Sequence, residues 1–282
     1  MRAPRPTSGQ DGTSPTAHRT RIFCPDPSLA ASLRAALAPA GAPAPTWTGY
    51  WSDLWRAAPD TGSLVVALPR LEDAAGEQIR RLRHRLPRCP IVLVTAAEPE
   101  NVKRLRSVPA DAVVWLDDLE ELPRALHAAR RACFLARAAA RIEHAAPRLG
   151  PRLARALALA LRAERPVTRV ADLARRAGTD RRTLDRAWRG AVGAACPLRL
   201  EDVLDWILLF HAHGLLAAGH KSVAVAVQLG IHEDTVARRA RALLGVTPRR
   251  LRAVPARTLE RRFAREVLYP ILSPPTSRSA AS

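Results

Sequence analysis

The spacing of hydrophobic residues predicts an α/β domain over residues 20–122. Short apolar runs of strand length alternate there with stretches of helical spacing. The runs occupy residues 21–24, 63–68, 90–95 and 112–115. Leucines four residues apart in 27–38 predict a helix between two of these runs, and 72–86 is also helical in pattern. Continuous apolar strands separated by helices are typical of a parallel sheet covered on both faces.

Three segments of the chain are less regular. Residues 46–55 are ambiguous, because the segment has room for a second strand and part of a helix. Residues 1–19 are rich in Pro, Ser, Thr and Gly and contain almost no apolar side chains, and the tail from Ser273 has the same character. Such segments bury too little surface to offset the entropy of ordering, so we expect both ends to be disordered.

Beyond residue 122 the strand signals stop and the chain becomes helical in composition. We predict a helical linker over residues 123–164, interrupted near Pro147 and Pro151. An all-α domain is expected over residues 165–252. Residues 253–282 are predicted to be helical at first and then to form the disordered tail.

A short helix followed by a basic helix is predicted at the start of this all-α domain. Residues 170–177 have one apolar side, and Gly178 suits the tight turn that follows. Asp180 is a suitable N-cap for the next helix, residues 181–191. The outer face of that helix carries Arg181, Arg182, Asp185, Arg186 and Arg189. This arrangement is the one that inserts a helix into the major groove of DNA.

A second unit of the same design follows. Ser222 is the expected cap of a helix that ends at Gly230, and a further helix runs over residues 233–244. The side chains expected to face outward from that helix are Thr235, Arg238, Arg239 and Arg241. Between the two units, residues 200–217 are apolar on most sides, which predicts a buried connecting helix.

The closing sequence GVTPRRLR at residues 245–252 completes a family pattern. Together with VADLARRAG and RRTLDRAWR, it makes residues 166–252 resemble the AraC/XylS-type DNA-binding domain. In that family two helix-turn-helix motifs flank a long linker helix and precede a closing G-V-[ST]-P motif. Glu233 and Asp234, at the start of the second basic helix, would repel phosphate. We therefore expect the first unit to make the stronger DNA contacts.

We hypothesise a set of DNA-binding residues on the basic faces of these units. From the first unit, base edges and the groove walls would be contacted by Arg181, Arg182, Arg186 and Arg189. Weaker contacts from the second unit would come from Thr235, Arg238 and Arg239. Phosphates would be held by Arg249, Arg250 and Arg252.

The order of elements in residues 20–122 resembles a response-regulator receiver domain, which has a flavodoxin-like fold. Asp26 lies near the position of the family's acidic pair, and Thr95 ends a strand as the family's Thr or Ser does. However, the run that should end in the phosphoacceptor aspartate ends in Leu68 and Pro69. A lone Asp26 cannot assemble a Mg²⁺ site. We expect a degenerate receiver without a phosphoacceptor or metal, used for dimerisation, partner binding or sensing.

Charge is distributed unevenly between the two parts. The chain has a formal net charge of +19. Residues 20–122 contain 12 basic and 13 acidic residues, whereas residues 123–282 contain 30 basic and 12 acidic ones. Almost all the positive charge is arginine, which suits phosphate and guanine but is also favoured by GC-rich genomes. A polyanionic partner for the C-terminal part is indicated, and nucleic acid is favoured over a membrane because no apolar stretch could span a bilayer.

Enzymatic and metal-binding functions find little support in the sequence. The four cysteines are scattered and none forms a C-x-x-C pair, which argues against a zinc site and suits a reducing cytoplasm. His211 and His213 have no cysteine or carboxylate at ligand spacing. Phosphate-binding loops and the G-x-S-x-G and H-E-x-x-H motifs are absent, so we expect no catalytic residues and no cofactor.

The sequence thus predicts a cytoplasmic, bacterial-type transcription regulator that binds double-stranded DNA. RNA polymerase and a second copy of the chain, joined through the N-terminal domain, are its expected protein partners. Two alternatives stay open. One is an interaction adaptor that retains the helical domain without binding DNA, and the other is a non-specific basic binder of nucleic acid.

Overall fold

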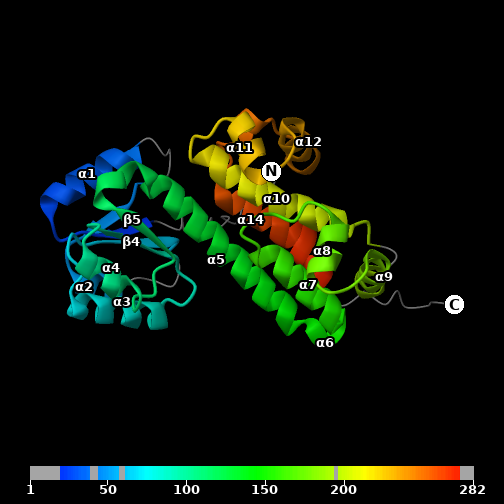
Figure 1. Ribbon diagram of the computed structural model, residues 1–282, viewed down its shortest axis with the longest axis horizontal. Coiled ribbons are helices and arrows are strands. Elements are labelled where there is room, and N and C mark those ends of the chain that lie inside the picture. Colours follow the sequence, from blue (N-terminus) through cyan, green and yellow to red (C-terminus); the bar gives the residue numbers. More distant parts are fainter. Residues whose placement is uncertain (1–19, 39–43, 57–60, 194–195, 274–282) are drawn as a thin grey trace, which may run out of the picture.

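The computed structural model describes residues 20–38, 44–56, 61–193 and 196–273. The disorder expected for residues 1–19 and 274–282 lies outside the described residues. Figure 1 shows an N-terminal α/β part and a C-terminal helical part, joined by one long helix. The coarse prediction of an α/β domain followed by an all-helical region is confirmed.

The N-terminal part is built on a sheet of five parallel strands. They are β1 (Thr20–Phe23), β2 (Thr46–Thr48), β3 (Ser63–Ala67), β4 (Ile91–Thr95) and β5 (Ala112–Trp115). Their spatial order is β2-β1-β3-β4-β5, the order found in flavodoxin-like doubly wound folds. The ambiguous segment 46–55 contains both expected elements, since β2 is followed by the short helix α2 (Trp51–Trp55).

Helices cover both faces of this sheet (Figure 1). One face packs against α1 (Pro27–Leu37) and the beginning of α5 (Leu122–His144). The other face packs against α2, α3 (Asp73–Arg85) and α4 (Pro99–Leu105). All residues of β3 and β4 are buried, because strands covered on both sides have no solvent-facing side chains. A short 3₁₀ segment, η2 (Leu116–Glu121), leads from β5 into α5.

Helix α5 belongs to the cores of both parts. Its first turns contribute Leu122, Leu126 and Ala129 to the core beneath the sheet. Its later turns contribute Leu135, Ala138, Ala139 and Ile142 to the core of the helical part. The segment 123–164, predicted to be a helical linker, is indeed helical. It also carries much of the packing that joins the two parts.

The C-terminal part consists of short helices around one central helix. The elements before the centre are α6 (Ala146–Leu149), α7 (Pro151–Arg162), α8 (Val170–Arg176) and α9 (Arg181–Val192). The central helix is α10 (Leu200–Ala217), followed by α11 (Ser222–Leu229), α12 (Glu233–Leu244) and α13 (Pro248–Leu251). The chain closes with α14 (Ala256–Phe263), the π-helical η3 (Ala264–Leu268) and α15 (Tyr269–Leu272).

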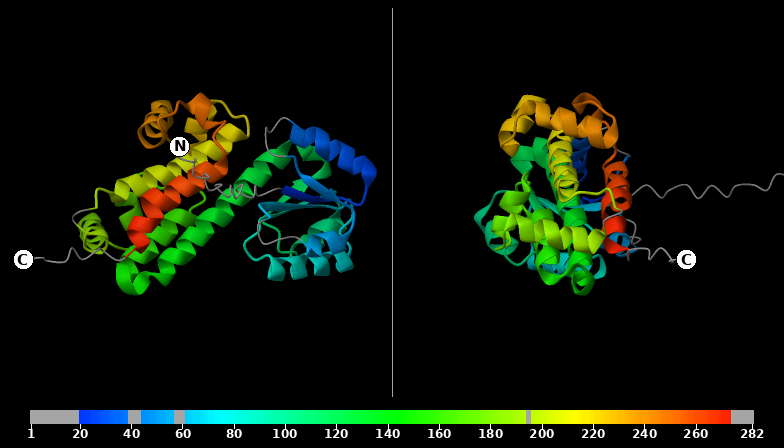
Figure 2. Two further views of the ribbon diagram at one scale, coloured as in Figure 1. Left: turned by 180° about the vertical axis from the view of Figure 1, so that it is seen from behind. Right: turned by 90° about the vertical axis from the view of Figure 1, so that its right-hand side faces the viewer.

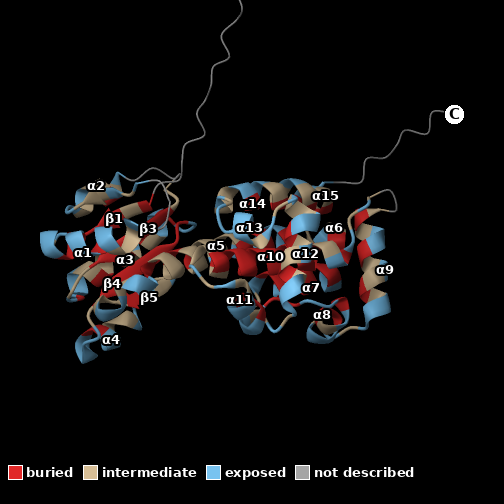
Figure 3. Cartoon of the chain, turned by 90° about the horizontal axis from the view of Figure 1, so that it is seen from above, coloured by how far each residue is buried: buried red, intermediate tan, exposed pale blue. Residues whose placement is uncertain are grey.

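The central position of α10 follows from its composition. Nearly all its side chains are buried, which confirms the predicted connecting helix (Figure 3). Trp206 and Phe210 of α10 pack with Phe134 of α5 and Phe263 of α14, with ring centroids 5.2–6.5 Å apart. Seen from behind, the helix formed by α14, η3 and α15 lies beside α10 (Figure 2). None of the described helices is long and apolar enough to cross a bilayer.

Candidate nucleic-acid interface

The first helix pair, α8 and α9, is joined by a sharp turn at Gly178. This residue has φ +67°, a left-handed conformation that favours glycine. Asp180 then caps α9 as predicted. Its carboxylate accepts hydrogen bonds from the Thr183 backbone N–H at 2.8 Å and from the Thr183 hydroxyl at 2.6 Å. These bonds to the charged form lower the pKa of Asp180.

Helix α9 is fixed by its buried face. Leu184, Trp188 and Val192 are buried against the helical core. The Trp188 indole N–H donates to the Leu198 carbonyl oxygen at 3.0 Å, which sets the rotation of the helix about its axis. The opposite face is exposed, as the helical spacing predicts, and it carries Arg182, Arg186 and Arg189. Arg181 is exposed too, but it lies in the first turn on the side of Leu184 and Trp188.

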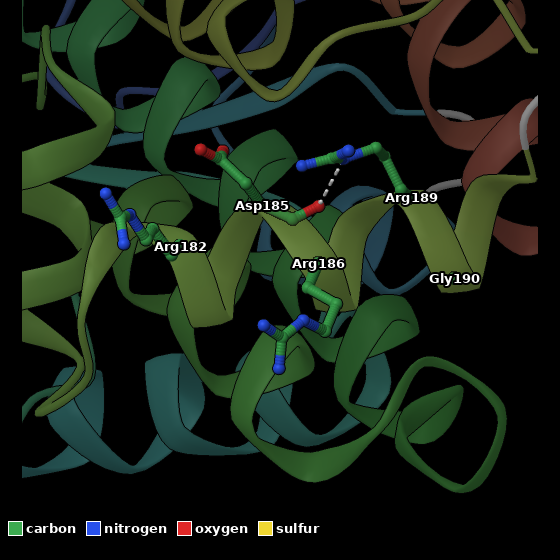
Figure 4. A pocket seen from close by; sticks show the side chains of 5 residues that line it. All are labelled: Arg182, Asp185, Arg186, Arg189 and Gly190. Carbon is green, nitrogen blue, oxygen red and sulfur yellow. Dashed lines mark hydrogen bonds between the residues drawn. The ribbon is translucent and has the colours of Figure 1, made fainter.

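A shallow hollow on this exposed face is lined by Arg182, Asp185, Arg186, Arg189 and Gly190 (Figure 4). The Arg189 Nε–H donates to the Asp185 carbonyl oxygen at 3.4 Å. Arg182 and Arg186 extend from the helix, and no hydrogen bond or ion pair engages their guanidinium groups in the described part of the chain. Both guanidinium groups are therefore available to an anionic partner.

Arg181 differs from its neighbours because it has two carboxylate partners. Its guanidinium lies 3.4 Å from Asp185 of the same helix and 3.5 Å from Glu201 of α10. Its side chain is 60% exposed, so these pairs are in contact with water and contribute little to stability. A phosphate could replace either carboxylate at small cost.

The second pair, α11 and α12, has the predicted glycine turn but a different cap. Gly230 ends α11 with φ +65°. The prediction that Ser222 caps α11 is wrong, since Lys221 occupies the N-cap position and Ser222 is already the first helical residue. His232 caps α12 by accepting from the Asp234 backbone N–H at 3.3 Å.

The predicted outward residues of α12 have different surroundings. Arg238 is exposed and Thr235 is half-buried. Arg239, predicted to face outward, instead turns toward α10 and forms an ion pair with Asp205, whose Oδ2 lies 2.8 Å from Nη1. The reason is positional, because Arg239 lies beside Ala240 and one turn after Val236, both buried residues of the packing face.

Asp205 is a functional candidate that sequence reasoning missed. It lies between the buried Leu204 and Trp206, in a stretch whose apolar character dominates the pattern. Burial raises the pKa of its carboxyl to about 6, although the nearby Arg239 guanidinium acts in the opposite direction. The one available signal was an isolated carboxylate within an otherwise apolar segment.

The predicted phosphate-binding arginines lie on α13 and at its end. Thr247 caps this short helix by accepting from the Arg250 backbone N–H at 3.4 Å, and Leu251 anchors it in the core. Arg249, Arg250 and Arg252 are exposed. Glu233 and Asp234 are exposed at the start of α12. The surface formed by α12 and α13 therefore carries negative as well as positive charge.

The carboxyl ends of the strands hold a closed polar network. The Thr95 hydroxyl lies 3.3 Å from the Pro69 carbonyl oxygen and accepts from the Asn101 side-chain amide at 3.1 Å. Asn101, which the sequence analysis did not single out, is 1% exposed and also accepts from the Leu71 backbone N–H at 2.8 Å. Its amide also donates to the Pro69 carbonyl oxygen, so Asn101 ties together the loops that follow β3 and β4.

Asp26 has a structural role in this part. Its carboxylate caps α1 by accepting from the Ser28 backbone N–H at 2.8 Å and from the Ser28 hydroxyl at 2.7 Å. These hydrogen bonds lower the pKa of Asp26. In the described part of the chain, no group of three or more His, Cys, Asp or Glu side chains is arranged to hold a metal ion.

The histidines of α10 are core residues. His211 and His213 are buried, and His213 Nε2 lies 2.8 Å from the Val254 carbonyl oxygen. The ring of His127 from α5 meets that of His213 edge-on, with centroids 6.4 Å apart. Burial lowers the pKa of His211 to about 3 and that of His127 to about 4, so both are neutral at pH 7.

No protein-family model, curated protein or solved structure matches this chain. What the molecule binds must therefore be inferred from the geometry of the two helix pairs and from the sequence motifs.

Proposed function

We propose that this chain is a sequence-specific DNA-binding transcription regulator, in which α8–α9 and α11–α12 act as helix-turn-helix units. The observation that carries the proposal is the outer face of α9. Arg182 and Arg186 project there without a partner among the described residues, from a helix whose inner face is anchored by Trp188. A rigid helix with exposed arginines behind a glycine turn is suited to the major groove.

The chemistry of arginine supports a role in base recognition. A guanidinium can donate two hydrogen bonds to O6 and N7 of guanine, the commonest specific contact in the major groove. We assign such contacts to Arg182 and Arg186. Arg181 and Arg189 would contact the flanking backbone, and Arg249, Arg250 and Arg252 would hold phosphates.

The order of elements further supports the proposal. The first pair, the buried helix α10, the second pair and the GVTPRRLR segment follow in the order known from the AraC/XylS-type domain. Thr235 and Arg238 would make the weaker contacts of the second unit. Arg239 is left out of this set because it turns inward and pairs with Asp205.

In this proposal the α/β part acts as a degenerate receiver that works without aspartyl phosphorylation. Leu68 and Pro69 follow β3, and Asn101 engages Thr95 in a buried network. A signal at this part would reach the DNA-binding helices through α5, which is packed into both cores. We propose a second copy of the chain, joined through the α/β part, and RNA polymerase as its protein partners.

One observation favours a protein-interaction role for the second pair. Val223 and Val227 of α11 are 59% and 77% exposed, and the first turn of α12 is acidic. A surface of this kind is better suited to a protein than to phosphate. An interaction adaptor is therefore the second candidate function.

Selection of binding sites from a random duplex-DNA pool by the full chain at physiological salt tests the proposal. The regulator account predicts an enriched motif. Recovery of DNA without sequence enrichment would support a non-specific basic binder, and no retained DNA would support the adaptor. Either result would overturn the proposal.

A further inference from the structure

Helices α10 and α12 meet at an ion pair within an apolar interface. Asp205 has a side chain only 10% exposed, and Arg239 is 35% exposed. The carboxylate oxygen and guanidinium nitrogen are 2.8 Å apart, which is hydrogen-bond distance for a charged pair. The pair therefore joins the central helix to the second helix of the second pair.

The fully buried apolar side chains that α12 contributes to this interface are few and small. Val236 and Ala240 are the buried residues of α12, and the half-buried Leu243 packs beside them. Helix α11 adds Val225 and Ala226 to the buried set. Short apolar side chains make few interlocking contacts, so hydrophobic packing alone defines the rotation and slide of α12 only loosely.

Burial of the charged groups makes the Asp205–Arg239 pair a poor source of stability for the fold. Glu201 and Asp202 of α10 add negative charge near Asp205, whereas Arg238 and Arg239 of α12 add positive charge. Burial outweighs the attraction and raises the pKa of Asp205 to about 6. The Nε of Arg239 is buried and has no hydrogen-bond partner in the described structure. Buried ion pairs with such desolvation costs often add little stability, but they can specify geometry.

We infer that Asp205 is a positioning residue that fixes the orientation of α12 on α10 by holding Arg239. This orientation determines the direction in which Arg238 and Thr235 leave the surface. The consequence for DNA rests on the proposed function, whereas the effect on helix orientation does not.

A neighbouring pair provides the matched control. Glu201, one turn before Asp205 on α10, lies 3.5 Å from Arg181 of α9. The side chains of Glu201 and Arg181 are both about half exposed, so solvent screens the interaction. Glu201→Gln should therefore leave the helices in place.

The first test measures helix orientation in the DNA-free full chain. Spin labels carried by non-natural amino acids at the exposed positions Gly190 and Ala242 report the distance between α9 and α12 by pulsed electron resonance. The native chain and Glu201→Gln should give one narrow distance distribution. The double variant Asp205→Leu/Arg239→Met, which leaves no unpaired buried charge, should keep the native melting temperature but at least double the width of the distribution.

An unchanged narrow distribution in the double variant would overturn the inference. If the double variant does not fold, Asp205→Asn provides the same test with little change in volume, and it too should broaden the distribution. Arg239→Lys keeps a positive charge opposite Asp205. This variant should therefore retain part of the narrow distance distribution that the double variant loses.

The second test uses sites selected from the duplex-DNA pool. The double variant should lose preference at positions contacted by the second unit and retain it at positions contacted by α9. If the native chain binds no DNA, the proposed function fails, but the distance measurement still decides the role of Asp205. If DNA binds with unchanged preference despite a broadened distribution, the orientation of α12 does not govern recognition.

Discussion

Arg130 of α5 donates a hydrogen bond from Nη2 to the Ser63 hydroxyl at 2.7 Å, at the start of β3. The same nitrogen lies 2.6 Å from the Thr20 hydroxyl at the start of β1. Burial lowers the pKa of Arg130, and Glu260 of α14 favours its charge from the helical part. One guanidinium therefore connects the sheet and α5 and is electrostatically coupled to the C-terminal region.

Arg130→Met should destabilise the protein strongly. The change leaves the hydroxyls of Ser63 and Thr20 buried with fewer partners and removes a cation near Glu260. We expect a loss of about 2–4 kcal/mol in the free energy of unfolding, measured in urea. Arg124→Met removes an arginine of the same helix that pairs with Glu121 on the surface, and it should cost less than about 1 kcal/mol. Equal losses would contradict this account.

Asn101→Leu should open the network at the carboxyl ends of β3 and β4. Without the amide, the Leu71 N–H and the Pro69 carbonyl lose a buried partner. The expected cost is about 1–3 kcal/mol in the free energy of unfolding. Val102→Ala changes the exposed neighbour on the same helix and should cost about 0.5 kcal/mol or less. Thermal unfolding of both variants provides the comparison, and a native-like Asn101→Leu would show that the network is dispensable.

The strands could be predicted because the chemistry of a doubly covered sheet is visible in the sequence. Residues 64–67 and 91–94 are apolar without interruption, and both runs are buried on both faces. The strand at residues 46–48 was ambiguous because it has three residues at the sheet edge and is only partly buried. The sequence shows that α5 is a helix, but its membership of two cores depends on tertiary packing.

In the candidate site, too, some features could be predicted from the sequence and others depend on tertiary contacts. The exposure of Arg182, Arg186 and Arg189 was predictable because they lie opposite Leu184 and Trp188 on a regular helix. The direction of Arg239 was not, because it depends on a carboxylate supplied by α10. Asn101 belongs to no periodic pattern, and its role appears only once two loops are brought together.

Gly178→Ala should destabilise the turn between α8 and α9. At φ +67° an alanine side chain is strained whatever space surrounds it, at a cost of about 1–2 kcal/mol. Gly190→Ala is the matched change within α9, where an added Cβ meets no atom within 4 Å. That substitution should stabilise the helix by about 0.5–1 kcal/mol. Unfolding in urea measures both, and a shift of the same sign in the two variants would refute the assigned role of the turn.

Acidification from pH 7 to pH 5 should lower the free energy of unfolding. The pKa values of His211 and His127 are about 3 and about 4 in the folded chain, well below the value of about 6.5 expected when unfolded. Below pH 6.5 the unfolded chain therefore takes up protons that the folded chain does not, costing about 2 kcal/mol per histidine at pH 5. Asp205, whose folded pKa is raised to about 6, offsets about 1 kcal/mol.

Urea unfolding of variants at pH 7 and pH 5 separates these contributions. His211→Leu should reduce the pH-dependent loss by about 2 kcal/mol, since burial and Arg131 keep this imidazole neutral. His84→Gln changes an exposed histidine of α3 and controls for the loss of an imidazole from the surface. An unchanged pH dependence in His211→Leu would show that His211 does not titrate as proposed.

We propose that Arg182 and Arg186 of α9 recognise DNA bases. The most direct test is the ratio of dissociation constants for a selected site and a scrambled duplex, measured with the full chain at physiological salt. The native chain and Arg155→Gln, a change on the exposed side of α7, should both favour the selected site by about 10³-fold or more. Arg182→Gln/Arg186→Gln should reduce that ratio at least tenfold, at about 1–3 kcal/mol per lost contact. A ratio unchanged by the double substitution would contradict the account.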